Sequence, residues 1–130
     1  MSGWKTPIRC YVSGAGNNLI ADWYARLTVQ EKADADEFLK DMRKTIASDW
    51  RMPSYRPSLW GLKGIGELRW HSEKKQHRLL GFFLDGAWIA VIGCTHKQQI
   101  YSPANALDTA KKYMNQIKGG KARPTVEYAL

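Results

Sequence analysis

The chain has 130 residues, of which 44% are hydrophobic, with six Trp and six Tyr, and this content predicts one folded domain with its own core rather than a disordered chain. Lys and Arg exceed Asp and Glu by 20 to 12, a net charge of +8, which indicates either a polyanionic partner such as nucleic acid or simply a positively charged, soluble surface. Because the sequence has neither a basic-then-apolar leader nor an apolar run of about 20 residues, we expect a cytoplasmic protein that does not enter a membrane.

The N-terminal half of the sequence predicts one strand followed by two helices. Residues 8–13 alternate and are β-prone, and the glycine-containing segment 14–18 ends this strand. Apolar residues then recur at helical spacing over 19–27. Thr28 and Glu31 form a capping-box pattern, which predicts that a second helix begins there. The apolar stripe of this helix is ordinary core and consists of Ala35, Phe38, Leu39, Met42 and Ile46.

The C-terminal half predicts three strands and a last helix. After an irregular, proline-containing connection, strands are expected near residues 65–71, 77–84 and 87–95. Asp85-Gly86 is a strong signal for a two-residue hairpin turn, because both residues tolerate positive φ. Ser102-Pro103 pairs an N-cap residue with a proline at the first helical position, which predicts the start of the last helix.

The pairing of these strands predicts two different sheet faces. The Asp85-Gly86 turn places Arg78 opposite Gly93, and a four-residue loop over 73–76 places His71 opposite Arg78. One face is apolar throughout and should be covered by helices; it holds Leu68, Trp70, Leu79, Phe83, Trp88, Ala90, Ile92 and Cys94. The other is predicted to be a groove and not a second core, with an apolar floor and a cationic end; it holds Glu67, Arg69, His71, Arg78, Leu80, Phe82, Ile89 and Val91. An odd number of residues in the first loop would exchange the two faces.

The cysteine and histidine residues predict no disulfide framework, no metal site and no other cofactor. Cys10 and Cys94 each fall inside a predicted strand, where a free cysteine behaves as a small buried hydrophobe. The three histidines, His71, His77 and His96, have no accompanying Cys or carboxylate arrangement of the kind that binds a metal.

The cations of the second face gather at one end of the sheet and form a candidate phosphate site. A strand arginine beside apolar residues must be paired or face an anion, so Arg78 is either salt-bridged or aimed at a phosphate. Glu67 is either a structural partner for Arg69 or Arg78, or a proton carrier. The chain leaves the fourth strand close by, at His96-Lys97.

Five further residues are candidates for this site, and for three of them an ordinary structural alternative stands beside the functional one. His96 is either a general acid or base or an inert loop residue, and Lys97 is either a phosphate contact or a solvated lysine. Tyr101 either stacks on a base or packs against the last helix. Lys63 and His71 would extend an RNA-binding surface. These residue types suit metal-free RNA cleavage, in which the 2′-hydroxyl attacks the adjacent phosphate, cations stabilise the developing charge and a His, Glu or Tyr moves protons.

The same positions resemble those of a known family, the RelE/HigB toxin superfamily of type II toxin–antitoxin systems, and in particular its phage-derived HigB-like branch. The residues that carry the resemblance are Leu62-x-Gly64-x-Gly66-Glu67-Leu68-Arg69, His77-Arg78-Leu79-Leu80, Val91-Ile92-Gly93, His96-Lys97 and Ser102-Pro103. The resemblance covers about residues 8–118. We expect a single domain over residues 1–118 and a tail over 119–130, in which residues 125–128 can add an edge strand.

The resemblance implies an α+β fold in which a twisted, mostly antiparallel, four-stranded sheet carries two N-terminal helices on one face and a C-terminal helix, with the helices on one side. It also implies an mRNA endonuclease that works on the ribosome without a cofactor. A cognate antitoxin, a helix-turn-helix protein encoded next door, would block it.

Matched by position, Arg69 and Arg78 correspond to the family's strand residues that contact the scissile phosphate, and His96-Lys97 to its late basic pair. Tyr101 matches a functional C-terminal residue only loosely, because the local spacing differs. The family's late pair is often Lys-Lys, so the cation count here is lower or depends on pH. The extension over 119–130 has no counterpart in the family.

Two other functions remain open. The order helix–strand–strand–strand–helix is also that of a non-catalytic double-stranded-RNA-binding domain, although the lysine cluster that such domains need at the start of the last helix is missing. A ParE-like relative that acts on another target, such as gyrase, would share the fold and lack a proton-transfer residue near Arg78.

Overall fold

The structure, a computed structural model, describes residues 4–13, 15–57, 64–97, 100–102, 104–118 and 125–127. For residues 96, 97, 100–102, 117, 118 and 125–127 it describes the backbone alone. Its helices are α1 (Leu19–Ala25), α2 (Val29–Lys44) and α3 (Ala106–Lys118), with a short 3₁₀ helix, η1 (Ala47–Asp49). Its strands are β1 (Ile8–Tyr11), β2 (Tyr55–Arg56), β3 (Gly66–Ser72), β4 (Lys75–Leu84), β5 (Ala87–Lys97), β6 (Ile100–Ser102) and β7 (Thr125–Glu127).

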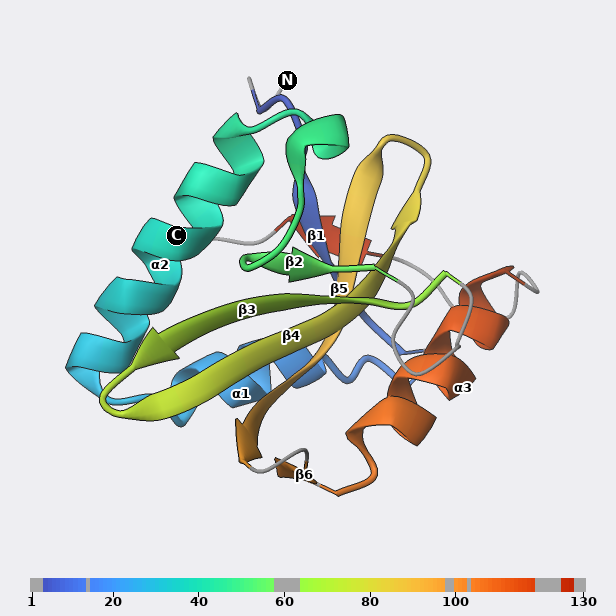
Figure 1. Ribbon diagram of the computed structural model, residues 1–130. Coiled ribbons are helices and arrows are strands. Elements are labelled where there is room, and N and C mark those ends of the chain that lie inside the picture. The colour runs from blue at the N-terminus through green and yellow to red at the C-terminus, as the bar shows by residue number, and fades with distance from the viewer. Residues whose placement is uncertain are drawn as a thin grey trace.

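The strands form one mixed sheet in the order β2-β3-β4-β5-β1-β7, with β6 paired to the end of β5 (Figure 1). β1 runs parallel to β5, and the other pairs are antiparallel. The α+β class is therefore confirmed, but the predicted number of four strands is wrong: the described residues form seven. Short segments that carry little periodicity make up the additional strands β2, β6 and β7, of which β7 is the edge strand expected in the tail.

The two N-terminal helices begin where their caps predict. The Asn18 side chain accepts a hydrogen bond from the Ala21 backbone N–H at the start of α1. At the start of α2, Glu31 N donates to Thr28 Oγ1 over 3.1 Å and Thr28 N donates to Glu31 Oε1 over 3.0 Å, which confirms the capping box. Both helices pack on one face of the sheet, whereas Ile46 lies beyond the end of α2 and is exposed.

The β3–β4 connection is a two-residue turn at Glu73-Lys74, not the predicted four-residue loop. Both residues have positive φ, at 51° and 64°, as a tight hairpin turn requires. Arg78 therefore lies opposite Arg69, and the predicted pairing of His71 with Arg78 is wrong. Because the predicted and observed loops both have an even number of residues, the faces of β3 and β4 remain as expected.

A β-bulge in β5 changes the second predicted register. The Asp85-Gly86 turn forms as expected, and Gly81 pairs with Ala90. Leu80 then pairs with Ile92, so Val91 is an extra residue on β5. As a result Arg78 lies opposite Cys94 instead of Gly93.

Beyond the bulge, alternate residues of β5 exchange faces. Ile92 and Cys94 pack in the core on the side of α3, so their predicted place beside Trp88 is wrong. Gly93 instead faces the N-terminal helices, where an added Cβ would lie 2.4 Å from the Trp23 ring.

The second sheet face carries a second core, contrary to the predicted open groove. Helix α3 covers the apolar floor of that face, and the buried residues there are Tyr11, Ile65, Leu80, Phe82, Ala87, Ile89, Val91, Ile92, Cys94, Ala106, Ala110 and Met114. In Figure 1, α2 and α3 accordingly lie on opposite sides of the sheet, so the helices do not share one side as the resemblance implied. The start of α3 is at Ala106; the predicted N-cap residue, Ser102, belongs to β6. Within the described residues, no helix combines the length and apolar character that a membrane span requires.

Candidate functional site

A cleft of about 430 Å³ opens beside the part of β3 and β4 that α3 leaves uncovered. The segment before β2 forms one wall, because Ser54 O accepts a hydrogen bond from Arg69 N and carries the chain alongside β3. Polar and cationic side chains of β3 and β4 contribute the rest of the lining. The lining residues are Met52, Pro53, Ser54, Arg69, Trp70, His71, Gln76 and Arg78.

Two arginines lie directly opposite each other in this cleft because of the β3–β4 register. Like charges at directly opposite positions destabilise a sheet unless a counter-charge is present. Glu67, two residues earlier on the same face of β3, provides one: its Oε1 lies 3.1 Å from Arg69 Nε and 3.3 Å from Arg78 Nε. The Glu67 side chain is only 2% exposed, so a single buried carboxylate holds both guanidinium groups.

Arg78 is enclosed by the protein. It is 3% exposed, its Nη1 donates to the His77 carbonyl over 3.0 Å, and its Nη2 donates to Gln76 Oε1 over 2.7 Å. A buried charge requires such partners, because the cost of removing it from water is otherwise several kcal/mol. Of the two possibilities left open by the sequence, a salt-bridged Arg78 is the one observed.

Arg69 is the more accessible of the two arginines. Its side chain is 23% exposed, and its Nη1 contacts Met52 Sδ over 3.2 Å at the wall of the cleft. An anion that enters the cleft therefore meets Arg69 before it meets Arg78. His71 is exposed and lies two residues after Arg69 on β3, nearer the hairpin turn. There it pairs with Gln76 of β4.

The remaining predicted residues are only partly covered by the structure. Lys63 lies outside the described residues. The backbones of His96 and Lys97 end β5, where they pair with Tyr101 and Ile100 of β6. Their side chains are outside the description, so the approach of the late basic pair and of Tyr101 to Arg78 stays a prediction.

Sequence reasoning missed Gln76 and the wall formed by Met52, Pro53 and Ser54. The predicted four-residue loop includes Gln76, and only the observed two-residue turn brings this residue into β4 beside Arg78. The wall depends on the pairing of β2 with β3, and a two-residue strand leaves no periodic signal.

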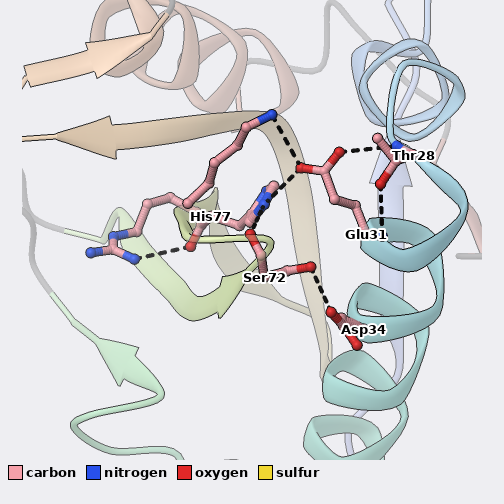
Figure 2. A network of polar contacts seen from close by, with 7 residues as sticks. Thr28, Glu31, Asp34, Ser72 and His77 are labelled. Carbon is pink, nitrogen blue, oxygen red and sulfur yellow. Dashed lines mark hydrogen bonds and ion pairs between the residues drawn. The ribbon is translucent and has the colours of Figure 1, made fainter.

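A partly buried network of polar groups lies between the β3–β4 hairpin and the start of α2 (Figure 2). Glu31 Oε2 lies 3.1 Å from His77 Nε2 and 3.5 Å from Lys75 Nζ. Ser72 Oγ donates to Asp34 Oδ2 over 2.6 Å. The His77 ring is 1% exposed and stacks on Trp70 at 5.7 Å between ring centroids. Because the His77 carbonyl accepts from Arg78, this network also supports the back of the cleft.

The environment of this network lowers three pKa values, those of His77, Glu31 and Asp34, and for Asp34 the main cause is the hydrogen bond from Ser72. Burial lowers the pKa of His77 from its usual 6.5, and the charge of Glu31 only partly opposes this effect. The backbone N–H of Thr28 is the main cause that lowers the pKa of Glu31 from 4.5. Near neutral pH the pair therefore consists of a neutral imidazole and an ionised carboxylate.

The thiols do not take part in the cleft chemistry. Cys10 and Cys94 are free and buried, as expected, and burial raises the pKa of each to about 12. A thiol with so high a pKa is almost never the thiolate that attacks a substrate. Within the described ranges, no group of three or more His, Cys, Asp or Glu side chains is arranged to hold a metal ion.

Comparisons with known proteins do not place the chain in a family. No protein-family model matches it, and neither a curated protein sequence nor a solved structure does so. The candidate site is accordingly defined by its own geometry: two opposed arginines, one shared buried carboxylate and an exposed histidine in a cleft at the end of a sheet.

Proposed function

We propose that the protein is the toxin of a type II toxin–antitoxin system and that it cleaves mRNA on the ribosome without a metal ion. The observation that supports this most is the cleft in which Arg69 and Arg78 lie opposite each other on one carboxylate. A pair of guanidinium groups fixed in this way matches a phosphodiester, whose oxygens accept hydrogen bonds from planar donors. The resemblance of these positions to the RelE/HigB toxins supports the same function.

The proposed reaction uses a nucleophile from the substrate. The 2′-hydroxyl of RNA loses its proton and attacks the adjacent phosphorus, the bond to the 5′-oxygen breaks, and that oxygen takes up a proton. The products are a 2′,3′-cyclic phosphate and a 5′-hydroxyl. Arg69 would stabilise the charge that develops on the phosphate oxygens, and His71, His96 and Lys97 are the candidates for proton transfer.

The partner in this proposal is an antitoxin that covers the cationic cleft. A net charge of +8 and two arginines in an open cleft favour an acidic segment as the covering element. We expect that protein to be a small helix-turn-helix protein encoded in the adjacent gene.

Non-catalytic RNA binding is a second candidate, and one observation favours it. Glu67, the predicted proton carrier, is held by both arginines in the interior of the protein, which leaves His71 as the titratable acid or base that lines the described part of the cleft. In this alternative, the cleft would hold a phosphate and not turn it over. A ParE-like protein that acts on gyrase would likewise need no proton carrier in the cleft.

Expression of the protein alone separates these functions. Induction should arrest growth, and mapping of mRNA 5′ ends should show cleavage of translated messages. Arg69→Ala, the sharper variant because Arg69 is partly exposed, should slow cleavage by purified protein on programmed ribosomes by about 10²-fold. Arg78→Ala should relieve both effects as well, provided that circular dichroism shows a folded protein.

The control is Arg26→Ala, which removes an exposed arginine at the end of α1, outside the cleft, and should change neither effect. Growth arrest with intact mRNA would exclude the nuclease and favour a target such as gyrase. Full viability on induction would exclude the toxin.

A further inference from the structure

Gln76 occupies the open side of Arg78. Its side-chain carbonyl accepts from Arg78 Nη2 over 2.7 Å, and both residues line the cleft. Arg78 directs its other nitrogens to groups of the interior, Nη1 to the His77 backbone carbonyl and Nε to the buried Glu67. Gln76 differs from those two partners because it is an exposed residue.

The amide of Gln76 is a weaker partner for a guanidinium group than a phosphate is. A guanidinium group forms a stronger hydrogen bond with a charged acceptor than with a neutral one. Its planar edge can also donate to two phosphate oxygens at once. A phosphodiester oxygen that reached Arg78 Nη2 would therefore replace Gln76 Oε1, and Gln76 could turn into solvent at little cost.

We infer that Gln76 is a displaceable plug of the anion site: it covers Arg78 in the free protein and gives up its place when a phosphodiester enters. This inference rests on the proposed function and adds to it how access to the site is controlled. Arg69, already 23% exposed, would receive the anion first, and Arg78 would join it only after the plug has moved. The plug also lowers the cost of burying Arg78 while no anion is bound, because the guanidinium group then keeps an acceptor on its open side.

The plug predicts a substitution that improves binding. Gln76→Ala removes the competitor and should tighten the binding of inorganic phosphate and of a 2′-O-methyl RNA tetranucleotide, which cannot be cleaved. The expected gain is roughly tenfold or more, the equivalent of one hydrogen bond between a neutral and a charged group. Isothermal titration of the full-length protein, checked by the NMR signals of the arginine side chains, would measure it.

Two controls test whether the gain arises at Arg78. Gln30→Ala removes another exposed glutamine, on α2, whose amide donates to Asp34, and it should leave both affinities unchanged. In an Arg78→Lys background, Gln76→Ala should bring no gain, because lysine has no Nη2 edge to uncover.

The outcomes separate the plug from the nuclease. Weaker binding by Gln76→Ala would show that Gln76 holds the ligand, and unchanged binding would show that it does not cover the site; either result overturns the inference. Failure of both proteins to bind either probe overturns it together with the anion site. Tighter binding by Gln76→Ala without any cleavage of mRNA supports the plug and contradicts only the nuclease.

Discussion

Glu67 is the residue on which the cleft depends. One of its carboxylate oxygens faces the Nε atoms of both Arg69 and Arg78, and the group is buried. Two guanidinium groups on directly opposite strand positions would repel each other without it. The role that this geometry supports is therefore to position the arginines, and proton transfer by Glu67 would require it to leave both of them.

Replacing Glu67 should cost stability. Glu67→Ala leaves the buried Arg78 without its counter-charge, and breaking a buried ion pair in this way costs about 3–5 kcal/mol of the free energy of unfolding. Glu67→Gln keeps a hydrogen-bond acceptor and should cost less, about 1–3 kcal/mol. Urea unfolding measures both values.

The matched control is Asp49→Ala, which breaks the exposed ion pair between Arg51 and Asp49, whose side chains are 72% and 56% exposed. That pair should contribute less than about 1 kcal/mol. A Glu67→Ala protein as stable as this control would contradict the structural role of Glu67.

Among the elements, the β3–β4 hairpin and α2 are joined through ionisable groups. Glu31 caps its own helix, and its Oε2 also lies 3.1 Å from His77 Nε2 and 3.5 Å from Lys75 Nζ of β4, so the start of α2 and the hairpin form one unit (Figure 2). The pKa values of His77 and Glu31 both lie below those of an unfolded chain, which are 6.5 and 4.5. In the interval below each usual pKa the unfolded state thus binds more protons than the folded state, and stability falls as the pH is lowered.

The free energy of unfolding should therefore decrease as the pH is lowered from 7.5 to 5.5. In this range His77 of the unfolded chain takes up a proton near its usual pKa of 6.5, whereas His77 of the folded protein takes it up less readily. The contribution of Glu31 should be lost only at lower pH, as the pH falls below 4.5 through its folded pKa. His77→Gln keeps a donor for Glu31 and should remove the first of these two decreases. Urea titrations at a series of pH values would show it.

His71→Gln provides the control, because it makes the same replacement at an exposed histidine of the neighbouring strand. This variant should retain the decrease seen in the unsubstituted protein. If His77→Gln retains it as well, the network does not carry the pH dependence.

At the scale of the whole molecule, the excess of positive charge and the cleft attract RNA in different ways. The net charge of +8 acts on any polyanion, whereas the cleft holds a phosphate at one place. Removal of any one arginine reduces the overall charge equally, so the position of the arginine separates the two effects.

Arg69→Ala should therefore weaken binding of the 2′-O-methyl RNA more than Arg26→Ala does. It should also reduce the slope of log K against log salt concentration by about 0.7, the contribution of one phosphate contact in single-stranded RNA. Fluorescence anisotropy over a range of salt concentrations measures both. Equal losses in the two variants would mean that the cleft makes no specific phosphate contact.

The parts of the fold that could be predicted are those with a local chemical signal. The residue types at Thr28 and Glu31 indicate a helix cap directly, and those at Asp85-Gly86 indicate a hairpin turn. Glu73-Lys74 does not, because neither residue is the Gly or Asn that usually marks positive φ. The bulge at Val91 lies within a continuous apolar run, where an extra residue changes no pattern.

The same distinction holds for the candidate site. The sequence could predict that Arg69, Arg78 and Glu67 share one face, because side chains alternate on a strand. The predicted loop is two residues longer than the observed turn, and an error of an even number of residues leaves the faces unchanged. The cover that α3 provides could not be predicted, since both faces of β5 are apolar and the stripe of α3 fits either. Gln76 and the Met52–Ser54 wall require the true registers of β3 with its two neighbours.

The position of β1 between β5 and β7 has a consequence for the order in which the sheet forms. β1 precedes the other described strands in the chain, yet its partners in the sheet are Trp88 to Ala90 of β5 and Thr125 to Glu127 of β7. Pairings so distant along the chain form late, because a long loop must close before they add stability. During synthesis β1 therefore cannot take its place in the sheet until β5 and β7 have been made.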